Sequence, residues 1–325
     1  MKIGQLEIKG NIFLAPMAGI TNLPFRTIAR EFGCSFAFTE MISATGLVRD
    51  SAKSYRYLDS SPADQPLGVQ IFGSDPGTMA EAARIVAANG ASLVDINMGC
   101  PVRKVVQSGA GAALMKDPER VRSILQALRV SINLPLSVKI RSGWNKSTIN
   151  AVDIALIAQD CGVDAITIHP RTAEQGFSGS ADWQIINQVQ KILSIPVIGS
   201  GDIRTGMDVL EMKRISCCDA FMVGRGSLGN PWIFQDIAAA LNDGIIRTFP
   251  SLSERRKVMH YHLEKEIAYA GEKNGCKCFR KHLLWYTKGL RGGGHFRQLA
   301  SSLTSSEQMK EAFDLYLSGM DDCTE

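Results

Sequence analysis

The sequence lacks the features that mark exported and membrane-bound proteins. It contains no uncharged apolar run of about 18 residues, the length that a membrane-spanning helix needs. Its first ten residues interrupt their apolar side chains with Lys2, Glu7 and Lys9, which argues against an export signal. We therefore expect a cytoplasmic protein that does not span a membrane.

Paired cysteines are also missing. The eight cysteines form no CxxC pair and show no spacing typical of a metal site, so we expect neither a disulfide framework nor a metal. They lie at positions 34, 100, 161, 217, 218, 276, 278 and 323. Free thiols in this number are typical of a reducing compartment.

Aromatic residues and charge of one sign are scarce as well. Aromatics make up 7% of the chain, and the formal net charge of +4 is too small to indicate a nucleic-acid partner by itself. Hydrophobic residues at 45% and charged residues at 21% exclude disordered and collagen-like chains. A length of 325 residues suits one large domain and a small one.

Eight short apolar or β-branched runs recur through the first three quarters of the chain. They cover residues 12–17, 35–41, 67–72, 92–98, 136–140, 164–170, 195–201 and 218–224. Segments with helical spacing of apolar residues separate most of them, at 76–90, 118–132, 149–162 and 206–215. This alternation predicts an α/β fold, either a (β/α)8 TIM barrel over residues 1–243 or an open, doubly wound sheet.

Polar residues end most of these runs, and this pattern favours the barrel. A barrel places its site at the carboxyl ends of its strands. The residues concerned are Glu40, Gln70, Asn97, Lys139, His169 and Asp202.

The pattern changes after residue 243, where strand-like runs stop. Amphipathic segments continue at 254–271, 279–290 and 306–319, and Pro250 with Ser251 supplies a break and a helix N-cap. These features predict a small C-terminal helical domain over residues 250–325.

Cys100 is the strongest candidate for chemistry, because it follows the fourth run directly in Asp95-Ile96-Asn97-Met98-Gly99-Cys100-Pro101. The glycine-rich stretch 107–114 behind it has the composition of a mobile lid. A free thiol has a pKa of about 8.5, so Cys100 is suited either to donate a proton or to act as a nucleophile. We interpret His169, at the end of the sixth run, as a ligand of substrate or cofactor and not as the base that would activate this thiol.

Two glycine-rich turns follow the seventh and eighth runs, at Gly199-Ser200-Gly201-Asp202 and Gly224-Arg225-Gly226. In TIM barrels the loops at these two positions bind phosphate through backbone N–H groups. The end of the first run, Ala15-Pro16-Met17-Ala18-Gly19, can place backbone atoms along the edge of a flat ring. Gln70 supplies an amide to this ring, and Lys139 supplies a positive charge that would stabilise its anionic form. Together they predict a flavin mononucleotide (FMN) site.

The C-terminal region carries a local excess of positive charge. Between residues 273 and 306 the chain has seven Lys and Arg residues, no Asp or Glu, and interleaved aromatic side chains such as Trp285 and Tyr286. Basic and aromatic side chains on helices suit phosphates and bases, so we favour an RNA-binding surface over a merely solvated helix face.

At this point the motifs resemble the tRNA-dihydrouridine synthases, most closely the bacterial B-type branch of that family. The blocks that carry the resemblance span nearly the whole chain in order. They are APMAGIT (15–21), Glu40-Met41, VQIFGSDP (69–76), DINMGCP (95–101), KIRSGW (139–144), TIHPRT (167–172), PVIGSGDI (196–203), GRGSLGNPWIF (224–234) and RKHLLWY (280–286).

The resemblance implies a monomeric FMN enzyme that uses NADPH to reduce the C5–C6 double bond of particular uridines in tRNA. Cys100 would be the proton donor, and Asn97 and Arg141 would contact the base, with Lys277, Arg280 and Lys281 on the RNA. The residues implied to hold FMN are Pro16, Met17, Ala18, Gln70, Lys139, His169, Ser200, Gly201, Asp202, Gly224 and Arg225. No metal is implied.

The sequence departs from the family's motifs at two positions, and two alternative functions are open. The family often has Gly where this chain has Pro170, and Asn where it has Ser200, which affects details of ring and phosphate contacts only. One alternative is a dihydroorotate dehydrogenase-like FMN barrel acting on a free pyrimidine, which needs no basic tail. The other is a non-catalytic RNA-binding protein, which needs neither Cys100 nor the glycine turns.

Overall fold

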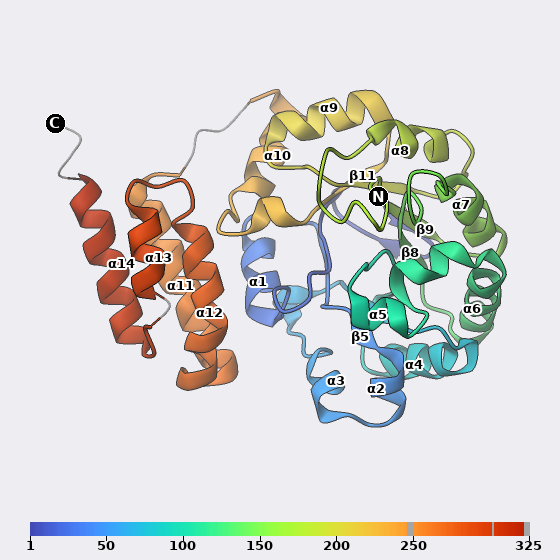
Figure 1. The fold of residues 1–325 in the computed structure, drawn as a ribbon, viewed down its shortest axis with the longest axis horizontal. Coiled ribbons are helices and arrows are strands. Elements are labelled where there is room, and N and C mark those ends of the chain that lie inside the picture. The colour runs from blue at the N-terminus through green and yellow to red at the C-terminus, as the bar shows by residue number, and fades with distance from the viewer. Residues whose placement is uncertain (246–249, 301, 322–325) are drawn as a thin grey trace.

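The computed structural model describes residues 1–245, 250–300 and 302–321. Residues 246–249, within the predicted junction of the two domains, lie outside the described residues, as does Cys323. Figure 1 shows two parts, a ring of strands surrounded by helices and a separate group of helices that ends the chain.

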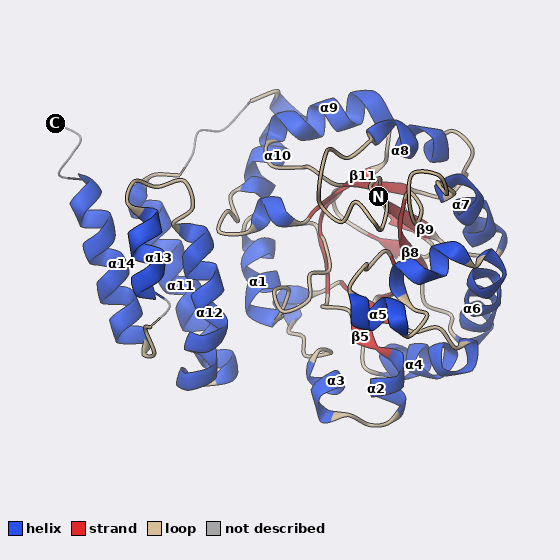
Figure 2. Cartoon of the chain, in the orientation of Figure 1, coloured by secondary structure: helices blue, strands red, loops and turns tan. Residues whose placement is uncertain are grey.

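Eight parallel strands form a closed ring, which confirms the predicted (β/α)8 barrel and excludes the open sheet (Figure 2). The ring closes because β4 pairs with β6 as well as with β3. All eight predicted runs are strands: β3 (Ile12–Leu14), β4 (Phe36–Phe38), β6 (Leu67–Phe72), β7 (Leu93–Met98), β8 (Leu136–Arg141), β9 (Ala165–His169), β10 (Val197–Ser200) and β11 (Ala220–Val223). A two-residue strand that was not expected, β5 (Ile42–Ser43), extends the edge of β6.

Helices cover the outside of the ring, and the four predicted ones are present. They are α4 (Pro76–Ala88), α6 (Pro118–Ser131), α7 (Ala151–Asp160) and α9 (Gly206–Ser216). Their starts follow local chemistry, since Asp75 and Asp117 cap helices that begin with proline and Thr205 closes a capping box with Asp208. Further helices of the barrel lie where no range was predicted: α1 (Leu23–Glu31), α8 (Trp183–Gln190) and α10 (Ile233–Asp243), besides the short α2 (Ala44–Val48) and α3 (Ala52–Arg56).

The amino-terminal hairpin closes one end of the barrel. Its strands β1 (Lys2–Ile3) and β2 (Leu6–Glu7) pair antiparallel. Ile3 and Ile8 share a buried cluster with Leu93, Ala165 and Ala220, the first residues of three barrel strands. The carboxyl ends of the strands therefore form the open end.

The C-terminal region is helical, as predicted, and forms its own core. It consists of α11 (Leu252–Ala270), α12 (Glu272–Tyr286), α13 (Gly293–Ala300) and α14 (Ser306–Asp321). Ser251 caps α11 in a capping box with Glu254, as expected of that residue. The segment 279–290 was misplaced, because its helix begins at Glu272 and ends at Tyr286.

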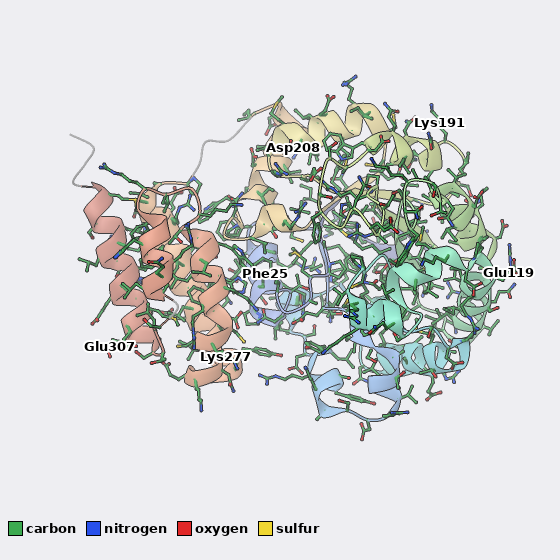
Figure 3. The ribbon with its side chains drawn as sticks, viewed as in Figure 1. Phe25, Glu119, Lys191, Asp208, Lys277 and Glu307 are labelled. Carbon is green, nitrogen blue, oxygen red and sulfur yellow. The ribbon has the colours of Figure 1, made fainter. Side chains whose placement is uncertain are left out.

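Helices α11 and α12 pack against the barrel through aromatic and polar contacts, and the Phe25 ring of α1 lies 5.8 Å from that of His262 on α11 and 5.4 Å from that of His282 on α12. The Tyr261 hydroxyl donates to Glu31 Oε1 at 2.8 Å, and the Tyr269 hydroxyl donates to Asp59 Oδ2 at 2.8 Å. Figure 3 shows Phe25 at the edge of the barrel that faces these helices. Within the described part of the chain no helix has the length and apolar character needed to cross a membrane.

Candidate functional site

A chain of buried hydrogen bonds runs along the inside of the barrel toward its open end. The Ser137 hydroxyl donates to Asp95 Oδ1 at 2.5 Å, and Gln70 Nε2 donates to Asp95 Oδ2 at 2.6 Å. Asn97 Nδ2 then donates to Gln70 Oε1 at 2.8 Å. Gln70 and Asn97, both predicted from the sequence, are thus joined directly.

Asn97 also holds the turn that carries Cys100. Its Oδ1 accepts the backbone N–H of Gly99 at 3.2 Å and that of Cys100 at 2.9 Å. The Cys100 carbonyl accepts the N–H of Ala112 at 2.9 Å, and Gly111 makes this approach possible because a Cβ there would lie 2.6 Å from the same oxygen. The cysteine is therefore fixed from both sides of its backbone.

The Cys100 side chain is half-buried at the open end of the barrel. Burial raises the pKa of the thiol above its ordinary value, while the neighbouring Arg141 charge opposes the shift without reversing it. The thiol is therefore protonated at neutral pH.

The glycine-rich stretch behind Cys100 is largely folded. It includes the end of α5 (Arg103–Gln107) and most of the 3-10 helix η2 (Gly111–Lys116). Ala110, Ala112 and Leu114 are fully buried, and η2 packs on β7 and β8. The expectation of a mobile lid here is not supported by this packing, which anchors the stretch to the barrel.

Arg141 is buried at the end of β8 and joins two loops. Its Nε donates to the Gly99 carbonyl at 2.7 Å, and its Nη1 donates to the carbonyls of Thr172 at 2.9 Å and Gly176 at 2.8 Å. Burial lowers the pKa of the guanidinium to about 10, so it keeps its charge at neutral pH. Arg141 thus stabilises the cysteine turn against the loop that follows β9.

A second arginine, Arg171, was not identified as a site residue although it stands in the TIHPRT block. It is 1% exposed and pairs with both oxygens of Asp202, Nη1 with Oδ1 at 2.9 Å and Nη2 with Oδ2 at 2.7 Å. Burial alone would raise the pKa of Asp202, but hydrogen bonds from Arg171 and the N–H of Ala181 outweigh it and lower that pKa. Asp202, predicted as a cofactor ligand, is thus the centre of an ion pair.

His169 lies beside this ion pair, with its Nε2 3.3 Å from Arg171 Nη1. Burial, with the charges of Lys139 and three arginines, lowers the pKa of His169 to about 2, so the imidazole is neutral. The role of His169 as a ligand of the cofactor or substrate stays a prediction.

The two glycine-rich turns come together at one side of the open end. Gly201 has a φ of 104°, and a Cβ there would lie 2.7 Å from His169 Cδ2. Arg225 Nη2 lies 3.5 Å from Asp202 Oδ1, and its guanidinium stands 4.2 Å from the centre of the exposed Phe177 ring. Backbone without side chains beside guanidinium groups is an arrangement that suits an anion.

The loop after β3 borders these turns. The Ala15 N–H donates to the Val223 carbonyl at 2.8 Å, and a Cβ on Gly224 would lie 3.9 Å from Met17 Sδ. Pro16 and Met17 are half-buried and Ala18 is exposed. The residues predicted to border a ring are thus adjacent to those predicted to hold its phosphate.

Lys139 is half-buried on β8, where the charges of Asp95 and Arg141 act on it. Burial and the Arg141 charge lower its pKa to about 8, against the opposing effect of Asp95. Burial raises the pKa of Asp95 to about 6. An ammonium group with so lowered a pKa marks a low-dielectric site, where a charge acts strongly on a bound group.

The three basic residues predicted on the tail differ in their surroundings. Lys277 is exposed on α12 (Figure 3), whereas Arg280 and Lys281 are half-buried. Lys281 Nζ donates to the Gly19 carbonyl of the barrel, and the Gly19 N–H donates to Glu40 Oε2. Lys281 therefore contacts the loop after β3 as well as belonging to the basic segment.

Comparison with known proteins gives one family. The family model described as dihydrouridine synthase (Dus) matches residues 13–318. The tRNA-dihydrouridine synthase B of Pasteurella multocida is 40% identical over 97% of this chain and 95% of its own. That of Xanthomonas axonopodis is 38% identical over 98% of both.

Solved structures share the fold at low identity. The 6-hydroxypseudooxynicotine amine oxidase of Pseudomonas geniculata has a TM-score of 0.58 at 14% identity, over 75% of this chain and 49% of its own. A 2-naphthoyl-CoA reductase has a TM-score of 0.57 at 13% identity, over 74% of this chain and 51% of its own. At these identities the likeness concerns the barrel architecture alone.

Proposed function

Because this chain belongs to the dihydrouridine synthase family, we propose that it reduces the C5–C6 double bond of uridines in tRNA. It does so as a monomer, with FMN as its cofactor, NADPH as reductant and the Cys100 thiol as proton donor. The single observation that carries the proposal is the Asn97 side chain, which bonds both Gln70 inside the barrel and the backbone N–H of Cys100.

The residues at the open end fit FMN. The phosphate would lie at Ser200, Gly201, Gly224 and Arg225, where a Cβ on Gly201 would strike His169. The ring would lie against Pro16 to Ala18, with Gln70, Lys139 and His169 around it. FMN supplies the hydride when it is bound and reduced.

Cys100 holds the proton that the reduction also requires. Its pKa is raised by burial, so the sulfur carries its proton at the pH at which the enzyme works. Asn97 and Ala112 hold the cysteine backbone, and Arg141 holds the adjacent Gly99 carbonyl, so the thiol is presented in one orientation. Positioning of this kind contributes to the rate because the donor needs no search for its geometry.

tRNA is the proposed substrate, and the helical tail is where it binds outside the pocket. A uracil inside folded RNA must leave its stack to enter a barrel, so the protein needs a second surface to hold the backbone. Lys277 is exposed on α12 and suits a phosphate, and Arg280 and Lys281 extend the same basic helix.

The test compares the purified wild-type protein with Cys100→Ala. The wild-type protein is expected to be yellow from bound flavin and to release FMN on denaturation. It is also expected to form dihydrouridine in tRNA that was isolated from cells without this protein. The variant is expected to keep FMN and tRNA binding but to form almost no dihydrouridine. Colourless protein that does not take up FMN, or turnover of free orotate or uracil in place of tRNA, would refute the proposal.

A further inference from the structure

Three ionisable side chains are buried together where the helical tail meets the barrel. His262 and Glu266 lie one turn apart on α11, and His282 comes from the facing side of α12. All three are at most 1% exposed. None of them belongs to the open end of the barrel, and the proposed reaction does not use them.

Their ligand atoms converge. His262 Nε2 lies 3.6 Å and His282 Nε2 lies 4.0 Å from the same Glu266 oxygen, Oε1, and all three ligand atoms lie within 4.8 Å of one another. In a tetrahedral zinc site, with metal distances of about 2.0–2.1 Å, ligand atoms are about 3.3 Å apart. Small side-chain rotations would bring these groups to that spacing.

The hydrogen-bonding capacity of the cluster is not filled by the protein. Among the described residues, His262 Nε2 and both ring nitrogens of His282 have no hydrogen-bond partner. The distances of 3.6 and 4.0 Å to the carboxylate are too long for hydrogen bonds. Buried polar atoms without partners are rare and destabilising, so we expect a bound group to lie between these side chains.

Burial, with the charge of Lys281 beside it, lowers the pKa of both histidines of the cluster. Within the described ranges, Glu266 forms no ion pair with lysine or arginine, and Asn22 Nδ2 donates to both its oxygens at 2.8 and 3.0 Å. A charge buried without an opposite charge costs on the order of several kcal/mol, so a cation bound among these side chains would have a stabilising place.

Neighbouring groups already orient two of the three side chains. His262 Nδ1 lies 3.1 Å from the Tyr286 hydroxyl, which leaves Nε2 directed at the carboxylate. Asn22 holds the carboxylate in the same way and at the same time caps α1, where its Oδ1 accepts the Phe25 N–H. Outer partners that hold the orientation of a side chain are typical of metal ligands.

From this geometry we infer that His262, Glu266 and His282 form a zinc site between α11 and α12, on the face of the helical tail that meets the barrel, where Asn22 of the barrel holds the carboxylate. Two imidazoles and a carboxylate are a ligand set that Zn²⁺ takes, with water in the fourth position. The metal compensates the buried carboxylate and fills the gap between the unpartnered nitrogens. This inference does not depend on the proposed reaction, and it departs from the expectation that the chain binds no metal, because the spacing of Cys and His in the sequence did not indicate it.

The experiment strips the purified full-length protein with a chelator, reloads it with Zn²⁺, desalts it and measures bound zinc by mass spectrometry. Wild type is expected to hold about one zinc ion per chain and to melt about 5 °C higher with zinc than without. Glu266→Gln and His282→Gln are expected to bind zinc with an affinity lower by about tenfold or more. The matched control is His260→Gln on the same helix, whose Nε2 lies 2.9 Å from Asp314 Oδ1 outside the cluster, and it should bind zinc as wild type does.

Glu266→Gln separates a metal site from a simple polar cluster. With no metal involved, this change removes the carboxylate but also one of the two oxygens that accept from Asn22 Nδ2, and zinc would stabilise neither the variant nor wild type. That result would overturn the inference, as would equal zinc binding in all variants.

A second measurement does not depend on how the variants fold. Crystals of the zinc-loaded wild-type protein, measured above and below the zinc absorption edge, are expected to show an anomalous peak between His262 Nε2, Glu266 Oε1 and His282. A peak elsewhere only, or a water at this position, would overturn the assignment. FMN content is expected to stay unchanged on chelation, so this test and that of the proposed function fail independently.

Discussion

Replacement of Asn97 by alanine tests the connection between the barrel interior and the cysteine turn. Asn97 Nδ2 donates to Gln70, and Asn97 Oδ1 accepts from the N–H groups of Gly99 and Cys100. The alanine variant loses all three bonds. It also leaves the Gln70 carbonyl oxygen buried without this partner.

The size of the effect follows from these bonds. Each contributes about 1 kcal/mol, and an unsatisfied buried acceptor adds about 1 kcal/mol, so Asn97→Ala should lower the free energy of unfolding by about 4 kcal/mol. This corresponds to a decrease in Tm of roughly 8–16 °C for a domain of the barrel's size. A thiol that moves by 1 Å loses about 100-fold in turnover, whereas FMN should remain bound.

Two further variants make the test specific. Asn97→Asp keeps the acceptor for Cys100 and Gly99 but loses the donor to Gln70, so it should retain more turnover than alanine at a similar cost in stability. Asn187→Ala on α8 removes a weaker amide bond, to the Ser216 carbonyl at 3.4 Å, and should cost less than about 1 kcal/mol.

The measurements are urea unfolding and the single-turnover rate of dihydrouridine formation. If Asn97→Ala unfolds within 1 kcal/mol of wild type, or turns over as fast, the hydrogen bonds do not carry the positioning that we assign to them, and the reasoning from them is refuted.

Three further predictions concern charge. Because burial raises the pKa of Cys100, and the thiol must be protonated to donate, loss of the thiol proton should lower the single-turnover rate only above about pH 8.5, the ordinary thiol value. A fall near pH 8 that disappears in Lys139→Met belongs to Lys139, whose pKa is about 8; a fall near pH 8 that persists in Lys139→Met contradicts the assignment. Arg171→Met leaves the Asp202 carboxylate without its main partner and should cost about 3 kcal/mol in urea unfolding together with FMN affinity, and a cost below 1 kcal/mol would count against the ion pair. Lys277→Met should weaken tRNA binding and reduce its salt slope by about 1, whereas Lys281→Met, which frees the Gly19 loop, should lower turnover more than affinity; equal effects of the two would show that Lys281 acts only on RNA.

The barrel and its open end could be predicted from the sequence because both are written in local patterns. Parallel strands buried on both faces read as short apolar runs, and each polar residue at a run's end lies at the same end of a closed ring. Gln70, Asn97 and Lys139 are close in space for this reason alone.

Other features depend on contacts that no local pattern records. Arg171 looks like an ordinary basic residue after a strand, and only the closed barrel brings it to Asp202, 31 positions further along the chain. The start of α12 was missed because its first turn, Glu272 to Gly275, carries no apolar periodicity and is ordered by packing against α11.

The junction between barrel and tail shows the same limit at a larger scale. His262 and Glu266 stand four residues apart on a helix, a spacing that by itself indicates only a shared face. They become part of a cluster only in the folded protein, where Asn22 donates to the Glu266 carboxylate from 244 positions away in the sequence and His282 of α12 lies beside it. A barrel that needs a second surface for its substrate also needs that surface at a fixed place. Buried polar contacts fix the orientation of the tail helices relative to the barrel, whereas apolar packing alone would let the helices slide. The same junction holds Lys281 against the Gly19 loop, so the attachment of the tail and the shape of the open end are set by neighbouring residues on α12.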